Sequence, residues 1–335
     1  MIRRTTVPFI VPWLVGVLVA ILWLPVALPP LLDDIYYRGP ASDHFDAHRF
    51  FNPDGSFGTG GSQRTSPSRM LRFATGRDRT AWPDSVAVTP TRPPARVPGS
   101  AIRATWVGHA TVLVQTEGLN ILTDPTWSDF ASPLPPFGPR RVRAPGIRFD
   151  DLPPIDVVLV SHNHYDHLDL PTLLRLWARD RPLIVTSLGN DTLMRRAGIA
   201  ARALDWDQRL TVRPGIDVIV ERVHHWGSRW LADRNRALWS GFTVTLPGGN
   251  LFFAGDTGLG SGSWVDDAAR RGPVRLALLP IGAYRPRELM SGNHLDPAEA
   301  VARVDAQNES GHRLPGQPGP QGMQRPQQQE QKRHE

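Results

Sequence analysis

Residues 157–169 read VVLVSHNHYDHLD, an apolar run followed at once by a cluster of histidine and aspartate. The chain has 11 histidines, and this short stretch holds three of them. A short, uniformly apolar run is typical of a strand that is buried on both faces. Neutral imidazole and carboxylate oxygen are the ligands that zinc and related metals take in proteins. The stretch therefore predicts a buried strand with a metal site at its end.

The composition of the 335 residues narrows the kind of site and of partner. There are no cysteines, so disulfides and thiolate metal sites are excluded and any metal must be held by His, Asp or Glu. The formal net charge is +6, and almost all of the positive charge is arginine. The arginines are scattered along the chain rather than clustered with aromatic residues, so we expect no nucleic-acid partner.

The N-terminal segment predicts a membrane anchor. Residues 5–32 carry no charge, and this segment is long enough to span a bilayer as an apolar helix. Two arginines precede this run and two aspartates follow it. The charge bias predicts a single-pass anchor over residues 1–32, with the N-terminus cytoplasmic and the remainder on the extracytoplasmic side. A cleaved signal peptide and a buried core helix are the alternatives.

The amino-acid composition changes three more times along the chain. Residues 33–100 are rich in Gly, Pro, Ser and Arg and predict an irregular arm that packs on the main domain. Residues 101–305 alternate strand-like and helix-like runs, beginning with two β-rich runs separated by Glu117-Gly118 that predict a hairpin. Residues 306–335 have low complexity and predict disorder. The pattern favours two sheets with helices outside and a site built from loops at the sheet edges.

The spacing of the cluster predicts two neighbouring metal centres. His162 and His164 alternate at the end of the strand and can point to one centre, while Asp166 and His167 lie further round the turn. In two-metal sites the ions lie about 3.5–4 Å apart. One loop does not supply enough ligands, and two more candidates follow later apolar runs: His225 and Asp256.

These motifs resemble the metallo-β-lactamase superfamily, and in particular the N-acyl-phosphatidylethanolamine-hydrolysing phospholipase D family. The resemblance rests on blocks between residue 42 and about residue 304. Among them are WVGHATVLVQ, ILTDPTWSDFASP, GPRRVR, LPPIDVVLVSHNHYDHLD, HHWGSRW, FAGDTG and PIGAY. It implies an α/β fold, the αββα sandwich, and two Zn²⁺ ions.

The resemblance also implies a role for each candidate residue. The first zinc would be held by His162, His164 and His225, with His224 at a position where the family has another polar residue. The second zinc would be held by Asp166 and His167, and Asp256 would bridge the two ions. Asp166 would also be catalytic. The substrate would be contacted by His294, Arg140 and Arg141.

One block of the family pattern is not found. In the family, a strand after the DPAEAV helix delivers a last histidine to the second metal. Here that helix leads into DAQNESGHRLPGQPGP, and neither His312 nor His334 has an apolar strand to position it. We therefore expect a sandwich that is incomplete at its C-terminus and a weakened second zinc site. The composition of the tail suggests a change of reading frame, which the intact mass of the natural protein would test.

The leading functional hypothesis is a membrane-anchored, zinc-dependent phosphodiester hydrolase that acts on a phospholipid through a metal-bound hydroxide. Arg140 and Arg141 would receive the phosphate. One alternative is a lactonase or another hydrolase on the same fold, because this fold hosts many reactions. A second alternative is a truncated, inactive, membrane-anchored relative. The sequence leaves the oligomeric state open.

Overall fold

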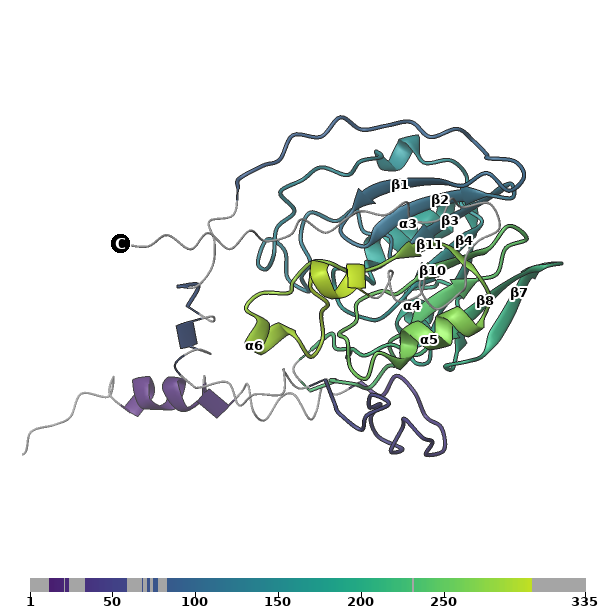
Figure 1. The fold of residues 1–335 in the computed structure, drawn as a ribbon. Helices are drawn as coiled ribbons and strands as arrows, with labels where there is room; N and C mark the ends of the chain where they lie inside the picture. The colour runs from purple at the N-terminus through teal and green to yellow at the C-terminus, as the bar shows by residue number, and fades with distance from the viewer. Residues whose placement is uncertain are drawn as a thin grey trace, which may run out of the picture.

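The computed structural model describes residues 12–20, 22–23, 34–58, 68, 71–72, 75–77, 83–230 and 232–302. Two sheets face each other in the body of the molecule, and helices lie on their outer faces (Figure 1). This is the mixed α/β sandwich that the resemblance implies.

The first sheet has six strands in chain order. Its first three strands form an antiparallel meander, and the rest pair in parallel. The strands are β1 (Arg103–Gly108), β2 (Thr111–Thr116), β3 (Leu119–Thr123), β4 (Val157–Val160), β5 (Leu183–Ser187) and β6 (Arg202–Leu204). The predicted hairpin at Glu117-Gly118 joins β2 to β3, but the region holds three strands rather than two. A further tight turn at His109 separates β1 from β2.

The second sheet has five strands in the order β11-β10-β9-β8-β7. They are β7 (Arg209–Arg213), β8 (Ile216–Glu221), β9 (Gly241–Val244), β10 (Asn250–Phe253) and β11 (Val274–Leu278). β10 and β11 are parallel, and the other pairs are antiparallel.

Apolar residues separate the layers. In β4, Val157 and Leu159 enter the core between the two sheets, while Val158 and Val160 pack under the helices on the other face. That alternation is the two-residue period of a strand, and it is apolar throughout because both faces are covered. The outer helices are α3 (Leu170–Asp180), α4 (Asn190–Arg196), α5 (Ser263–Arg270) and the short α6 (Arg287–Met290).

The strand directions bring several loops to one edge of the sandwich. β1 and β3 run in the same direction because each is antiparallel to β2, and β4 is parallel to β3. The residues after these three strands therefore share an edge. In the other sheet, β8 and β10 are both antiparallel to β9, so the residues after them also share an edge.

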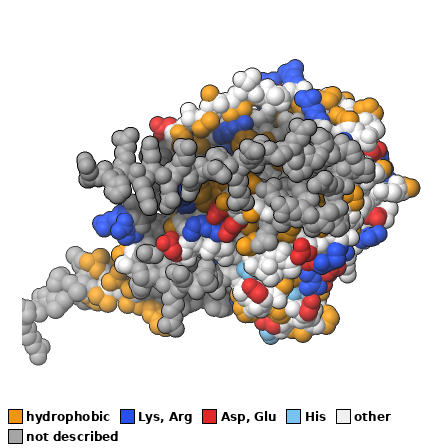
Figure 2. All heavy atoms as spheres, in the orientation of Figure 1, with side chains coloured by type: hydrophobic (Ala, Val, Ile, Leu, Met, Phe, Trp, Pro, Cys, Tyr) orange, Lys and Arg blue, Asp and Glu red, His pale blue; other side chains and the backbone are white. Residues whose placement is uncertain are grey.

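The arm upstream of β1 contains isolated bridges but no strand or helix within 34–58 and 83–100. Phe45 and Phe50 of the arm are nevertheless buried in the core between the sheets. Across the face shown in Figure 2, arginine side chains are interspersed with acidic ones over the described surface.

Two sequence predictions concern the termini. Most of the predicted anchor over 1–32 and all of the predicted tail over 306–335 lie outside the described residues. Residues 12–20 and 22–23 are helical. Among the residues that can be described, no helix is both long and apolar enough to cross a bilayer.

Candidate metal centre

The end of β4 and the end of β8 bring together three histidines from distant parts of the chain. His162 and His164 follow β4, and His225 follows β8. Their ligand-capable nitrogens all lie within 4.8 Å of one another. His162 Nε2 lies 2.8 Å from His164 Nδ1, and the rings of His162 and His225 have centroids 4.7 Å apart. The structure thus joins the three residues that the sequence assigned to one centre.

A hydrogen bond orients the ring of His225 so that a lone pair faces inward. His225 Nδ1 lies 3.1 Å from the carbonyl oxygen of Asn293, to which it donates, so its Nε2 carries the lone pair. This buried Nε2 has no hydrogen-bond partner within the described part of the chain. Burial and the neighbouring imidazoles hold the pKa of His162 well below its ordinary value, and burial lowers that of His164 to about 4. Neutral imidazoles with inward lone pairs are what a metal requires.

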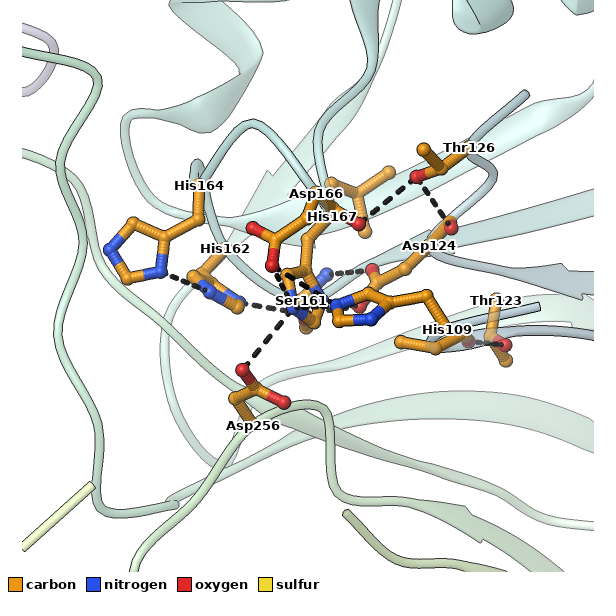
Figure 3. A network of polar contacts seen from close by, with 12 residues as sticks. His109, Thr123, Asp124, Thr126, Ser161, His162, His164, Asp166, His167 and Asp256 are labelled. Atoms are coloured by element: carbon orange, nitrogen blue, oxygen red, sulfur yellow. Dashed lines mark hydrogen bonds and ion pairs between the residues drawn. The ribbon is translucent and has the colours of Figure 1, made fainter. Parts of the chain in front are cut away.

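A second group lies beside the first and contains His109, Asp166 and His167 (Figure 3). His109 Nε2 lies 3.1 Å from Asp166 Oδ2 and 3.3 Å from His167 Nε2. Burial alone would raise the pKa of Asp166, but the charge of His167 and the hydrogen bond from His109 hold it well below its usual range. The carboxylate is therefore ionised throughout the neutral pH range.

Asp256, which follows β10 of the second sheet, faces both groups. Its Oδ2 is 3.2 Å from His167 Nε2, 4.0 Å from His225 Nε2 and 3.8 Å from His294 Nδ1. Burial would raise the pKa of Asp256, but the charge of His167 and the hydrogen bond from it hold that pKa well below its usual range. An ionised carboxylate between two imidazole groups can bridge two cations.

Asp124, directly after β3, connects the two groups through hydrogen bonds (Figure 3). It is fully buried and accepts hydrogen bonds from Ser161 Oγ at 2.6 Å and from His167 Nδ1 at 2.6 Å. Because the Ser161 hydroxyl proton points to Asp124, Ser161 Oγ accepts from His162 Nδ1 at 2.9 Å. One carboxylate thereby leaves the Nε2 of both His162 and His167 free to bind a metal.

The donor set and its spacing fit two divalent cations. Protein ligands bind zinc at about 2.0–2.2 Å, which places neighbouring ligand atoms of a tetrahedral site about 3.3 Å apart. Within the second group, His109 Nε2 lies 3.1 and 3.3 Å from Asp166 and His167, which are themselves 3.9 Å apart, and His167 lies 3.2 Å from Asp256. The first centre would be held by His162, His164 and His225. The second would be held by Asp166 and His167, with Asp256 between the two.

The remaining predicted site residues differ in their surroundings. His294 lies at the cluster, with its ring centroid 5.3 Å from that of His225. Arg141 instead donates to the backbone carbonyls of Thr126 and Ser128, at 3.0 and 3.2 Å, and braces the loop after β3. Arg140 is exposed. The guanidinium of Arg141 is therefore engaged in stabilising this loop, and the same group would have to make the predicted phosphate contact.

His224 lies outside the metal groups. Its Nδ1 donates to the carbonyl oxygen of Gly292 at 2.7 Å, and its Nε2 lies 2.9 Å from Asp54 Oδ2. The ring therefore ties the arm to the loop before His294, which leaves His225 as the member of the pair that faces the cluster.

Sequence reasoning missed two residues of the site, His109 and Asp124. Asp124 had a usable signal, because it follows the buried strand β3 just as Ser161 and His162 follow β4. His109 was hidden because the run from Ala101 to Thr116 reads as one continuous strand. Gly108 before it marks the turn that splits this run.

Several known proteins are similar to this chain. A family model described as "Beta-lactamase superfamily domain" matches residues 119–311. N-acyl-phosphatidylethanolamine-hydrolyzing phospholipase D 1 of Caenorhabditis elegans is 40% identical over 213 residues, which cover 60% of this chain and 60% of that protein. The mitochondrial N-acyl-phosphatidylethanolamine-hydrolyzing phospholipase D of Saccharomyces cerevisiae is 36% identical, over 59% of this chain and 43% of the yeast protein.

A metal-dependent hydrolase of Pyrobaculum neutrophilum is 27% identical over 226 residues, which cover 60% of this chain and 91% of that protein. This chain therefore spans most of the archaeal relative but less than two thirds of the nematode and yeast proteins.

Proposed function

The chain belongs to the beta-lactamase superfamily, and we propose that it is a metal-dependent hydrolase whose substrates are phosphodiesters of the N-acyl-phosphatidylethanolamine type. One observation carries the proposal: three strand ends of two sheets bring His162, His164 and His225 against Asp166, His167 and Asp256. The identity to two phospholipases D supports the substrate class.

In this proposal, some residues of the site bind the cations and others bind the substrate. When bound, two zinc ions supply a water that ionises near neutral pH and positive charge beside the phosphoryl oxygens. Asp166 and Asp256 remain ionised and suit cations better than they suit proton transfer, because a carboxylate with a depressed pKa is a weak base. The catalytic role of Asp166 stays a prediction, and the geometry favours the ligand role for it.

His294 is the residue best placed to contact substrate. Its ring lies 3.8 Å from Asp256 and is only partly buried, and burial lowers its pKa, so it is neutral near pH 7. A neutral, partly exposed imidazole beside the cluster can donate one hydrogen bond to a phosphodiester oxygen.

The test compares substrates and metal states in the purified full-length chain. Zinc-loaded protein should release N-acylethanolamine from vesicles that contain N-acyl-phosphatidylethanolamine, and chelation should abolish the release. His162→Ala should lose the activity, while His48→Ala, which changes an exposed histidine of the arm, should keep it. Hydrolysis of lactones but not of phosphodiesters would favour the alternative enzyme, and no hydrolysis of either would favour the inactive relative.

The predicted membrane association remains a prediction. An N-terminal anchor would hold the site close to a lipid substrate, which fits the proposed substrate class. Expression of the full chain followed by separation of membrane and soluble fractions, with alkaline washing of the membranes, would test it. Recovery of the chain in the soluble fraction would contradict it.

A further inference from the structure

We infer that His109 is a protein ligand of the second metal, together with Asp166 and His167. The inference rests on the proposed function, which it deepens by naming a ligand that arrives from a different part of the chain. The sequence assignments gave this centre only Asp166, His167 and the shared Asp256. The residues described in the structure add one imidazole to them.

Three ligand atoms, from His109, Asp166 and His167, lie close enough together to bind one cation. His109 Nε2 is 3.1 Å from Asp166 Oδ2 and 3.3 Å from His167 Nε2, and His167 Nε2 is 3.2 Å from Asp256 Oδ2. These separations match the edge of about 3.3 Å expected for ligands around one tetrahedral zinc. Asp166 Oδ2 and His167 Nε2 are slightly further apart, at 3.9 Å.

The hydrogen bonding of His167 favours a metal over a simple contact between the rings. Its Nδ1 proton is directed to the buried carboxylate of Asp124, at 2.6 Å. In the neutral ring, Nε2 therefore carries a lone pair that faces His109 Nε2 and the carboxylates of Asp166 and Asp256. A divalent cation at this point would bind His109 Nε2, His167 Nε2 and the Asp166 carboxylate together.

The backbone of His109 adopts a strained conformation that directs its side chain toward Asp166 and His167. His109 lies in the turn between β1 and β2 with φ of 50°, in the left-handed region that non-glycine residues rarely adopt. The indole Nε1 of Trp106 donates to the carbonyl oxygen of His109 at 2.9 Å and holds the turn. A positive φ at a non-glycine residue of a site is typical of a position kept for function.

The exposure of His109 distinguishes it from the other histidines of the cluster. Its side chain is 47% exposed, whereas that of His167 is fully buried. The second centre would therefore open to solvent on the side of His109, and we expect its metal to exchange faster than the metal of the buried first centre.

The opposing interpretation is that His109 only donates a hydrogen bond to Asp166 and so positions that carboxylate. Two substitutions separate the roles. His109→Asn tolerates the positive φ of the turn but removes the imidazole. His109→Gln keeps a longer amide that can still donate to Asp166, although it is a poor ligand for zinc. His48→Asn, at an exposed position of the arm, is the matched control.

The experiment measures zinc binding rather than activity. The full chain and each variant are freed of metal, checked for folding by thermal unfolding, and titrated with zinc against a chromophoric chelator. We expect two zinc ions in the wild type and in His48→Asn. In both His109 variants the first zinc should keep its affinity, while the dissociation constant of the second should rise by about 100-fold.

The outcomes distinguish this inference from the proposed function. Two ions of unchanged affinity in both His109 variants, or full recovery of the second ion by His109→Gln alone, would overturn the ligand assignment and leave the hydrolase proposal standing. A wild-type chain that binds a single zinc would also overturn it. A wild-type chain that binds no zinc would remove the proposed function as well.

Discussion

At the scale of single residues, the site depends on which nitrogen of each histidine carries its proton. His162 donates through Nδ1 to Ser161, His167 donates through Nδ1 to Asp124, and Ser161 in turn donates to Asp124. A single buried carboxylate thus sets the tautomer of one ligand in each centre. Such partners of ligating histidines commonly change metal affinity by about 10- to 100-fold when they are removed.

We predict that Asp124→Asn weakens both metal centres. The amide would present N–H groups where the carboxylate accepts from Ser161 and His167, and the protein would lose about 1–3 kcal/mol of stability. Zinc titration should show both dissociation constants raised by at least about tenfold. Asp150→Asn, whose side chain is 93% exposed, is the control. Unchanged zinc affinity in Asp124→Asn would contradict the tautomer argument.

The histidines also predict how the stability of the metal-free protein depends on pH. Burial holds the pKa values of His162, His164 and His225 below the ordinary 6.5, so these rings take up protons on unfolding. Their contribution to stability is present above pH 6.5 and is lost as the pH falls, for His164 down to about pH 4. His167 opposes this trend, because nearby carboxylates raise its pKa against the effect of burial.

The pKa of His294 is also lowered and that of His44 is also raised. With four lowered rings against two raised ones, the melting temperature of the metal-free chain should be lower at pH 5 than at pH 7. Differential scanning calorimetry in the presence of a chelator would measure it. His164→Gln should show a smaller drop, because one buried neutral ring is gone. A melting temperature that is higher at pH 5 would contradict the prediction.

At the scale of the elements, strand ends and helix starts position the loops of the site. The loop after β3 is fastened to the start of α3 by Asp169, the N-cap of that helix. Asp169 Oδ2 accepts from the backbone N–H of Trp127 at 3.1 Å and of Ser128 at 3.0 Å, and from Thr172 Oγ1 at 2.7 Å. This one carboxylate therefore fixes both the helix and the loop that carries Asp124.

We predict that Asp169→Ala lowers the free energy of unfolding by about 2–4 kcal/mol. The cap alone is worth about 1 kcal/mol, and the half-buried backbone N–H of Ser128 would lose its acceptor, while that of Trp127 keeps Thr172 Oγ1. Asp191→Ala in the first turn of α4 removes only a surface pair with Arg195, so it should cost about 0.5 kcal/mol or less. Urea denaturation of both variants would check this, and equal costs would contradict it.

The sequence pattern predicted the buried strand β4 and the hairpin at Glu117-Gly118, because an uninterrupted apolar run and a glycine turn are both local signals. The continuous run before Glu117 concealed the turn at His109, since a strand on each side of a tight turn gives the same β-rich composition. The last described helix begins with a capping box: Asp296 accepts from the N–H of Glu299 at 2.8 Å, and Glu299 accepts from the N–H of Asp296 at 2.9 Å. Capping depends on residues three apart, so local sequence is sufficient to predict it.

At the scale of the whole molecule, the arm before β1 supports the first metal centre. Asn52 is fully buried and pairs with the backbone of His225 in both directions, each bond 3.0 Å long. It also accepts from the indole Nε1 of Trp239, at 3.1 Å, in the core between the sheets. A residue far upstream of the histidine cluster therefore holds one of its members in place.

We predict that Asn52→Ala weakens zinc binding at the first centre by about tenfold or more and lowers the stability by about 2–4 kcal/mol. The buried backbone N–H and carbonyl of His225 would both lose their hydrogen-bond partner, while the indole of Trp239 keeps the carbonyl of Val223. Zinc titration and urea denaturation measure the two effects. His48→Ala on the same arm is exposed and should change neither. A loss of stability without a change in zinc affinity would confine Asn52 to a structural role.

Local pattern was sufficient to predict the buried strand before the histidines, the layered sandwich and the candidate ligands at strand ends, because each depends on neighbouring residues and their period. Only the tertiary structure decided which strand ends meet. The pairing of β1, β3 and β4 places His109 and Asp124 beside Asp166 and His167, and the packing of the second sheet brings His225 and Asp256 to face them. Contacts between residues so far apart in the chain depend on strand direction and sheet packing, which no local pattern specifies.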